Sequence, residues 1–130
     1  MRFVAYGHPN ILCTHRNTFE FTKDEYVSRK GDCMVGVNAN YDVKELRKLL
    51  NSSELVIRIR VGDLVEEINC LPNPRFSCAK ELVVRRSSFD SERTLGLRAD
   101  KAAVDFMFKG RLKDPNQVIE VEICEKIVRE

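Results

Sequence analysis

Residues 54–70 read ELVIRIRVGDLVEEINC, and this stretch decides the fold. Apolar residues recur at every second position before Gly62, which is the pattern of a strand that buries one face. Glycine tolerates a positive φ, so its place as the first of two turn residues, before Asp63, favours a type II′ hairpin. The turn sets the register, and the resulting pairs are Val61 with Leu64, Ile57 with Ile68, Leu55 with Cys70 and, on the opposite face, Arg58 with Glu67.

Strand character extends toward both ends of the chain. The stretch 117–128 places Ile119, Val121 and Ile123 on one face and glutamates on the other, as a half-exposed strand does. Four more segments are predicted to be strands, namely 2–6, 12–22, 33–38 and 81–86.

Two helices are predicted. Asp42 precedes VKELRKLL, residues 43–50, and Glu45 follows three positions later, which is a capping-box pattern. The second helix covers ADKAAVDFMFKGRLKD, residues 99–114, and ends before Pro115. Its apolar side is expected to consist of Ala103, Phe106 and Met107.

Together these elements predict a single α+β domain over residues 1–130. Strands outnumber helices and several are joined by short turns, so we expect a curved, mainly antiparallel sheet with two helices packed against it. Partial closure of the sheet into a barrel is an open alternative. A chain of 130 residues with 43% hydrophobic residues is large enough to bury a core.

Composition excludes several classes of protein. The apolar runs are too short to span a membrane, and the opening stretch MRFVAYGHPN turns polar too quickly for a signal peptide. The five cysteines form no CxxC pair, so neither a zinc site nor another metal site is predicted. We therefore expect free, mostly buried thiols and a cytoplasmic location. The chain has no glycine-rich phosphate loop and no nucleophile elbow, and no motif in it predicts a particular cofactor.

Basic residues are concentrated in one region. The net charge of +2 does not by itself indicate nucleic acid, but residues 75–101 hold seven basic and four acidic residues. Arg98, Asp100 and Lys101 stand at the start of the second predicted helix, where an anion would be stabilised, although Asp100 can equally well complement the helix dipole. The first functional hypothesis is a binding module for RNA or a nucleotide-like anion that uses Arg85, Arg86, Arg98 and Lys101.

The two histidines lie close together in the sequence. His8 lies in GHPN, where Gly7 permits unusual backbone angles and Asn10 can cap a turn through its side chain. His15 lies in the predicted strand 12–22, on a face that also carries a cysteine and two phenylalanines. Each histidine has a structural interpretation, as a turn residue or a half-buried strand residue, and a chemical one, as a ligand contact or a base.

A further candidate is RKGDCMVGV, residues 29–37. Asp32 in a turn beside Cys33 would place a base near a nucleophile, whereas the structural interpretation makes Asp32 a turn cap and Cys33 a core residue. The second functional hypothesis is a small enzyme with acid–base or thiol chemistry in a pocket formed by His8, His15, Asp32 and Cys33. No recognised catalytic motif supports it, so binding is favoured.

Four blocks of the sequence, YGHPNI, THRNTFEFTKDEY, RKGDCMVGVNA and LRADKAAVDF, together resemble the archaeal family catalogued as domain of unknown function 371. The resemblance covers nearly the whole chain, and GHPN and GDC are its specific parts. It implies an archaeal, cytoplasmic source and a stand-alone domain, and it implies no reaction. It also draws attention to the residues inside these blocks, namely His8, Asn10, His15, Asp32, Cys33, Asp100 and Lys101.

Overall fold

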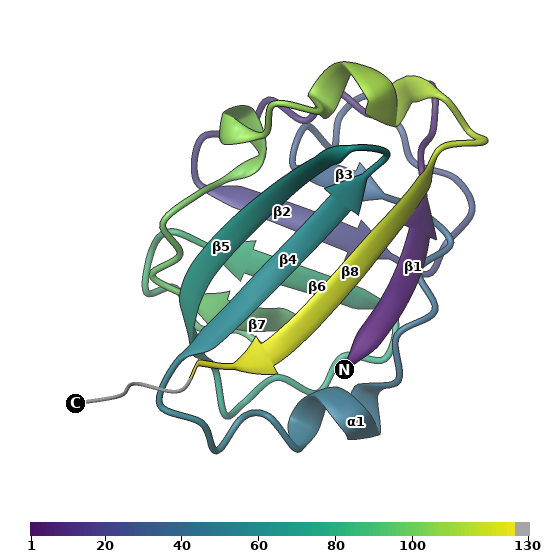
Figure 1. The fold of residues 1–130 in the computed structure, drawn as a ribbon. Coiled ribbons are helices and arrows are strands. Elements are labelled where there is room, and N and C mark those ends of the chain that lie inside the picture. Colours follow the sequence, from purple (N-terminus) through teal and green to yellow (C-terminus); the bar gives the residue numbers. More distant parts are fainter. Residues whose placement is uncertain (127–130) are drawn as a thin grey trace.

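The computed structural model describes residues 1–126. Within them the chain forms eight strands, one short α-helix and two 3-10 turns (Figure 1). The strands are β1 (Arg2–Tyr6), β2 (Thr18–Thr22), β3 (Met34–Gly36), β4 (Leu55–Val61), β5 (Leu64–Pro72), β6 (Glu81–Arg85), β7 (Thr94–Leu97) and β8 (Val118–Glu125). The helix α1 covers Val43–Arg47, and the 3-10 turns η1 and η2 cover Ala103–Asp105 and Lys109–Lys113.

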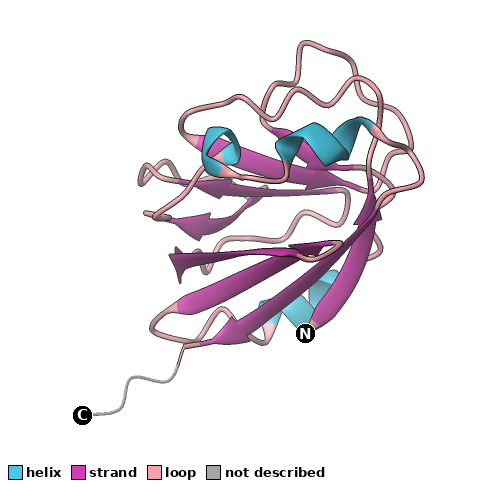
Figure 2. Cartoon of the chain, turned by 45° about the horizontal axis from the view of Figure 1, so that its top comes forward, coloured by secondary structure: helices cyan, strands magenta, loops and turns pink. Residues whose placement is uncertain are grey.

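The strands form one open sheet in the order β1-β8-β4-β5-β7-β6-β2-β3. The mainly antiparallel sheet is confirmed, although the pairs β2–β3 and β6–β7 are parallel and make it mixed. The sheet folds over, so that the half with β1, β8 and β4 faces the half with β7, β6 and β2 (Figure 2). Its two edges meet at an isolated antiparallel bridge, in which the backbones of Tyr6 and Val37 exchange hydrogen bonds of 2.8 Å.

The hairpin of β4 and β5 has the predicted register at every pair named above. Gly62 has a φ of +62° and Asp63 does not share the positive φ, as a type II′ turn requires. The apolar residues of β4 are buried, and on the outer face the Arg58 guanidinium pairs with Glu67 at 3.0 Å. β8 lies on the other side of β4, and its Glu122 carboxylate is 3.2 Å from Arg58.

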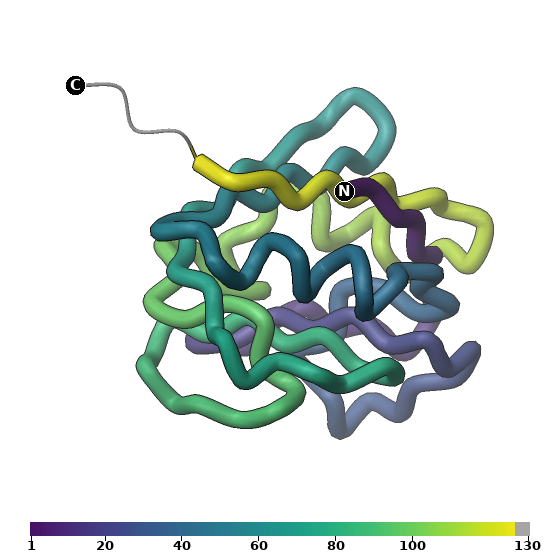
Figure 3. The backbone as a smooth tube through the Cα atoms, turned by 90° about the horizontal axis from the view of Figure 1, so that it is seen from below, coloured from purple at the N-terminus to yellow at the C-terminus, as the bar shows by residue number. Residues whose placement is uncertain are grey.

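The first predicted helix is confirmed in a shorter form. The Asp42 side chain accepts a hydrogen bond from the Lys44 backbone N–H at 2.8 Å and so caps α1. Leu46 and Leu50 are buried beneath it. Seen from below, the chain around α1 crosses the end of the core between the two halves of the sheet (Figure 3).

The second predicted helix, 99–114, is wrong. This segment contains only the two 3-10 turns, and Met107 is 71% exposed whereas Phe106 and Phe108 are buried. A helix would use the Met107 backbone N–H internally, but this group donates to Glu66 Oε2 at 2.8 Å. Asp105 Oδ2 accepts from the Ala102 backbone N–H at 2.9 Å, which caps only the short turn η1. Within residues 1–126, no helix has the length and hydropathy needed to cross a bilayer.

Several strand boundaries also differ from the prediction. Residues 12–17 are not a strand, because Cys13 has a φ of 54° and the next two backbone N–H groups both donate to the Asp32 carbonyl. Strand β3 ends at Gly36, two residues before Asn38, whose φ is 53°. The strand β7 was not predicted. β8 ends at Glu125, and residues 127–128 of the predicted last strand lie outside the described residues.

Candidate functional site

A pocket of about 630 Å³ opens over the outer face of β2 and β6, beside the loop that leads into β3. Strand β2 is buried on both faces, with Phe19 and Phe21 in the core and Glu20 toward the pocket. The pocket contains His15, Asp32 and Cys33, three of the four residues predicted to share one pocket, together with Arg85 from the predicted anion-binding set. Its other polar lining residues are Asn17, Thr18, Glu20, Lys30, Ser87 and Arg93.

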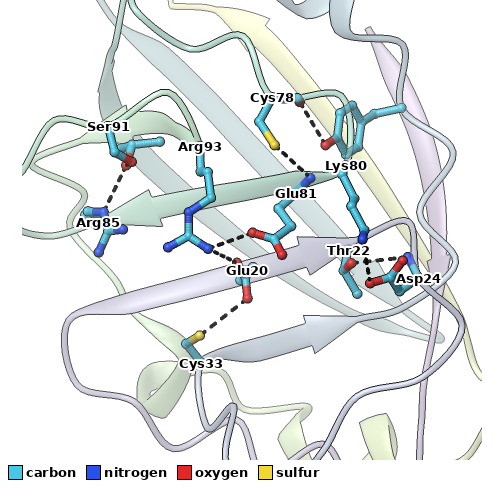
Figure 4. A network of polar contacts seen from close by, with 12 residues as sticks. Glu20, Thr22, Asp24, Cys33, Cys78, Lys80, Glu81, Arg85, Ser91 and Arg93 are labelled. Atoms are coloured by element: carbon cyan, nitrogen blue, oxygen red, sulfur yellow. Dashed lines mark hydrogen bonds and ion pairs between the residues drawn. The ribbon is translucent and has the colours of Figure 1, made fainter.

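Glu20 is the most buried charged group of this pocket, with 9% of its surface exposed. Its Oε2 accepts a weak hydrogen bond from the Cys33 thiol at 3.7 Å, and its Oε1 lies 3.9 Å from Arg93 Nη1 (Figure 4). Burial, and next the nearby carboxylate of Glu81, raise the pKa of Glu20 above its ordinary value. The Arg93 guanidinium opposes this shift but is held mainly by Glu81, at 2.7 Å.

Cys33 is poorly suited to act as a nucleophile in this setting. Burial, and next the charge of Glu20, raise the pKa of its thiol to about 11. A thiol with that pKa is almost entirely protonated near neutral pH, whereas catalytic cysteines have lowered pKa values. The arrangement therefore makes Cys33 a hydrogen-bond donor to Glu20 (Figure 4).

Arg85 differs from the other arginines of the pocket. Its Nε donates to Thr94 Oγ1 at 2.9 Å, and its guanidinium lies 4.9 Å from the ring centroid of Phe89. Among residues 1–126, it forms no ion pair with a carboxylate. Burial, and next the charge of Arg93, lower the pKa of Arg85, and the group nevertheless stays charged at neutral pH. Arg85 is thus a half-buried cation that can accept an anion.

His15 lies in the bend before β2, and its imidazole lines the pocket instead of pointing into the core with the phenylalanines. Its Nδ1 accepts hydrogen bonds from the backbone N–H groups of Asn17, at 3.0 Å, and Thr18, at 3.1 Å. Two donors on Nδ1 place the proton of the neutral ring on Nε2. In that tautomer His15 offers the pocket a donor.

His8 does not line this pocket, so the structure does not bring the two histidines together there. The His8 Nδ1 accepts from the Asn10 backbone N–H at 3.0 Å, and its ring packs edge-on against Tyr26. The turn is therefore capped by His8 and not by Asn10, whose side chain donates instead to the Val27 carbonyl at 2.9 Å. Gly7 has no positive φ. Close packing against the backbone of residues 112–114, and not an unusual backbone angle, explains why a glycine occupies this position.

The other predicted anion-binding residues also lie outside the pocket lining. Arg86 Nη1 is 3.8 Å from Asp105, and Lys101 Nζ is 3.1 Å from the buried Glu66. Asp100 accepts from the backbone and the side chain of Asn69, both at 3.0 Å. Arg98 is exposed and has a φ of 52°. No helix begins at this segment, and the expected helix N-terminus is absent.

Sequence reasoning missed three charged residues of the pocket, Glu20, Lys30 and Arg93. Glu20 could have been found from the sequence, because it stands between two phenylalanines in TFEFT. A carboxylate in such a buried strand needs a hydrogen-bond or ion-pair partner. Lys30 and Arg93 are ordinary loop residues in the sequence. Only the fold places them beside β2.

A second depression, of about 600 Å³, lies over the outer face of β1, β8 and β4. Its cations are already paired with carboxylates, since Arg2 and Arg58 both reach Glu122 and Arg60 reaches Glu120. No group of three or more histidine, cysteine or acidic side chains within residues 1–126 is arranged to hold a metal ion, and all five cysteines are free. We therefore take the pocket with Arg85 as the candidate site.

The charge of Glu20 leads to a first prediction. A carboxyl group whose pKa is raised by folding contributes its full stability at low pH and loses it as the pH rises through the folded-state pKa. We therefore expect Glu20→Gln to be more stable than the unmodified protein at pH 7. The gain should shrink as the pH falls through the raised pKa and vanish below the ordinary carboxyl range.

Urea unfolding of both proteins between pH 3 and pH 8 measures this effect. The control is Glu45→Gln, which changes an exposed glutamate on α1 and should show no comparable gain at pH 7. A loss of stability at pH 7 would show that Arg93 and Cys33 stabilise the Glu20 carboxylate more than burial disfavours it. A gain that does not change with pH would show that the gain does not come from the charge of Glu20.

The comparisons with known proteins agree with the resemblance noted in the sequence. A family model described as "Domain of unknown function (DUF371)" matches residues 3–126. The chain is also similar to "Uncharacterized protein MJ0206" of Methanocaldococcus jannaschii, with 29% identity over an alignment 119 positions long that covers 81% of this chain and 84% of the relative. The family match includes the segments that form the pocket, and the chain belongs to the DUF371 family.

Proposed function

We propose that this protein binds a small phosphate-bearing anion in the pocket between β2, β6 and the loop before β3. The observation that carries the proposal is Arg85, a half-buried guanidinium that lines the pocket and forms no ion pair within residues 1–126. A planar guanidinium with free N–H groups matches the geometry of phosphate oxygens.

The surroundings of Arg85 suit an anion. Lys30 and Arg93 line the same pocket, and the His15 tautomer supplies a neutral donor. The opposing carboxylates are Asp32 and Glu20, and the raised pKa of Glu20 lowers its tendency to be charged. The volume of about 630 Å³ lies within the range of small-ligand sites.

A small ligand is favoured over RNA. RNA binding draws its affinity from several phosphates that are neutralised along one basic surface. Of the four basic residues predicted for that role, only Arg85 lines the pocket, while Arg86 and Lys101 are engaged by Asp105 and Glu66. The thiol-enzyme alternative is disfavoured by the raised pKa of Cys33.

Calorimetric titration with inorganic phosphate and pyrophosphate at low salt tests the proposal. We expect Arg85→Gln to weaken binding about tenfold or more, because a hydrogen bond to a charged group contributes roughly 1.5–3 kcal/mol. The matched control is Arg86→Gln, which removes the neighbouring charge outside the pocket and should bind as the unmodified protein does.

Thermal unfolding of both variants checks that each is folded. Equal losses in the two variants would mean that only the general charge matters. The same titration with a single-stranded RNA oligonucleotide tests the RNA hypothesis. Tight RNA binding that does not depend on Arg85 would replace the small-ligand proposal with the RNA hypothesis.

A further inference from the structure

Phe89 is a large apolar side chain that the fold leaves in water. It lies in the loop between β6 and β7 and is 62% exposed. The loop connects it to the candidate site, because Ser87 lines the pocket and the Ser87 hydroxyl accepts from the Phe89 backbone N–H at 3.3 Å. The ring is therefore at the rim of the site.

The ring is also in contact with the cation that we propose to hold the anion. The Arg85 guanidinium carbon lies 4.9 Å from the Phe89 ring centroid, which is a cation–π distance. The Nε of the same guanidinium is bound to Thr94. Arg85 thus lines the pocket with its guanidinium against an aromatic ring, and only its Nε is engaged by a hydrogen bond within residues 1–126. Most of the Phe89 surface stays open for a second contact.

The other strongly exposed apolar side chains have no such connection. Tyr26 packs against His8 at a centroid distance of 5.4 Å, and Met107 follows Phe106 on the 3-10 segment. Neither residue lines the pocket or contacts one of its cations. Exposed aromatic rings beside a bound phosphate are a recurrent way of holding a nucleobase, because every base has a π face that can stack.

We propose that the ligand of this site is a nucleotide whose phosphate is bound by Arg85 and whose base stacks on Phe89. This inference rests on the proposed function and adds the aromatic part of the ligand to it. Arg85 is the link between the two parts, because its guanidinium contacts the ring and the residue lines the pocket proposed for the phosphate.

Binding of three probes tests the inference: inorganic phosphate, ribose 5-phosphate and adenosine monophosphate. Ribose 5-phosphate offers the same phosphate and sugar without a base. The unmodified protein should bind adenosine monophosphate at least about fivefold more tightly than ribose 5-phosphate, the factor that corresponds to a weak base–aromatic stack. Phe89→Leu should remove this preference, and it should weaken the binding of ribose 5-phosphate less than that of adenosine monophosphate, because Arg85 stays in the pocket.

The matched control is Tyr26→Leu, which removes an exposed aromatic ring away from the pocket and should keep the preference. If the unmodified protein binds ribose 5-phosphate and adenosine monophosphate equally tightly, the nucleotide inference is wrong, while the proposed phosphate site is still supported. An equal loss of both ligands in Phe89→Leu also overturns it, because Phe89 would then only position Arg85. If none of the probes binds, the proposed function fails, and the nucleotide inference fails with it.

Discussion

Gly7→Ala should destabilise the protein by about 3 kcal/mol, the upper end of the usual cost of overpacking, because a clash with backbone cannot be relieved by turning a side chain. A Cβ atom on Gly7 would overlap the backbone carbonyl oxygens of Leu112 and Asp114. Both oxygens are held in place, since the adjacent His8 N–H donates to the Leu112 oxygen at 2.8 Å and the Gln117 N–H donates to the Asp114 oxygen at 3.0 Å.

Urea unfolding at pH 7 measures the loss. Gly110→Ala is the matched control, because no atom lies within 4 Å of a Cβ at that position and its φ is not positive. That substitution should leave stability unchanged or raise it by up to about 1 kcal/mol, through the smaller entropy of the unfolded chain. If the two variants unfold at the same urea concentration, residue 7 does not pack closely against the backbone of residues 112–114.

Glu66→Ala should cost about 3 kcal/mol, since it removes a buried carboxylate that pairs with the half-buried Lys101 and also accepts from a backbone N–H group. Only 4% of Glu66 is exposed. Its two oxygens hold the segment after β7, with Oε1 at 3.1 Å from Lys101 Nζ and Oε2 at 2.8 Å from the Met107 backbone N–H. The substitution would leave the Lys101 ammonium group and the Met107 backbone N–H without this partner.

The control for this loss is Glu120→Ala on the neighbouring strand β8. Glu120 is 63% exposed in its side chain and lies 4.0 Å from Arg60, so its removal should cost less than about 1 kcal/mol. Chemical unfolding of both variants gives the comparison. Similar losses would show that the Glu66 pair is no stronger than a surface ion pair. A third variant, Glu66→Gln, keeps an acceptor for the Met107 N–H and should lose less stability than Glu66→Ala.

The candidate site was only partly visible in the sequence. His15, Asp32, Cys33 and Arg85 were each chosen for their chemistry, and all four line one pocket. The sequence predicted a shared pocket for His15, Asp32 and Cys33, but it did not show that Arg85 joins them, because the antiparallel pair β2–β6 joins residues that are up to 67 positions apart. The pocket excludes His8 and includes Glu20, on β2, and Arg93, which lies next to β6 through a hydrogen bond from the Val83 backbone N–H to its carbonyl; no local motif marked either residue.

The sequence by itself determined the elements whose information is local. The β4–β5 register follows from a two-residue turn and a period of two, and the cap of α1 follows from Asp42 at the helix start. Each depends on neighbours within a few positions, and the structure agrees in both cases.

Tertiary structure decided the segments whose backbone groups find distant partners. Residues 99–114 have a helix-like pattern, but Glu66 on β5 takes a backbone N–H of that segment, and Phe106 and Phe108 both enter the core, which an α-helix does not allow for residues two apart. Residues 12–17 have a strand-like alternation, but they bond to the Asp32 carbonyl instead of a neighbouring strand. A local pattern records only what a segment prefers alone, and burial of a distant carboxylate or ring outweighs preferences of a few tenths of a kcal/mol per residue.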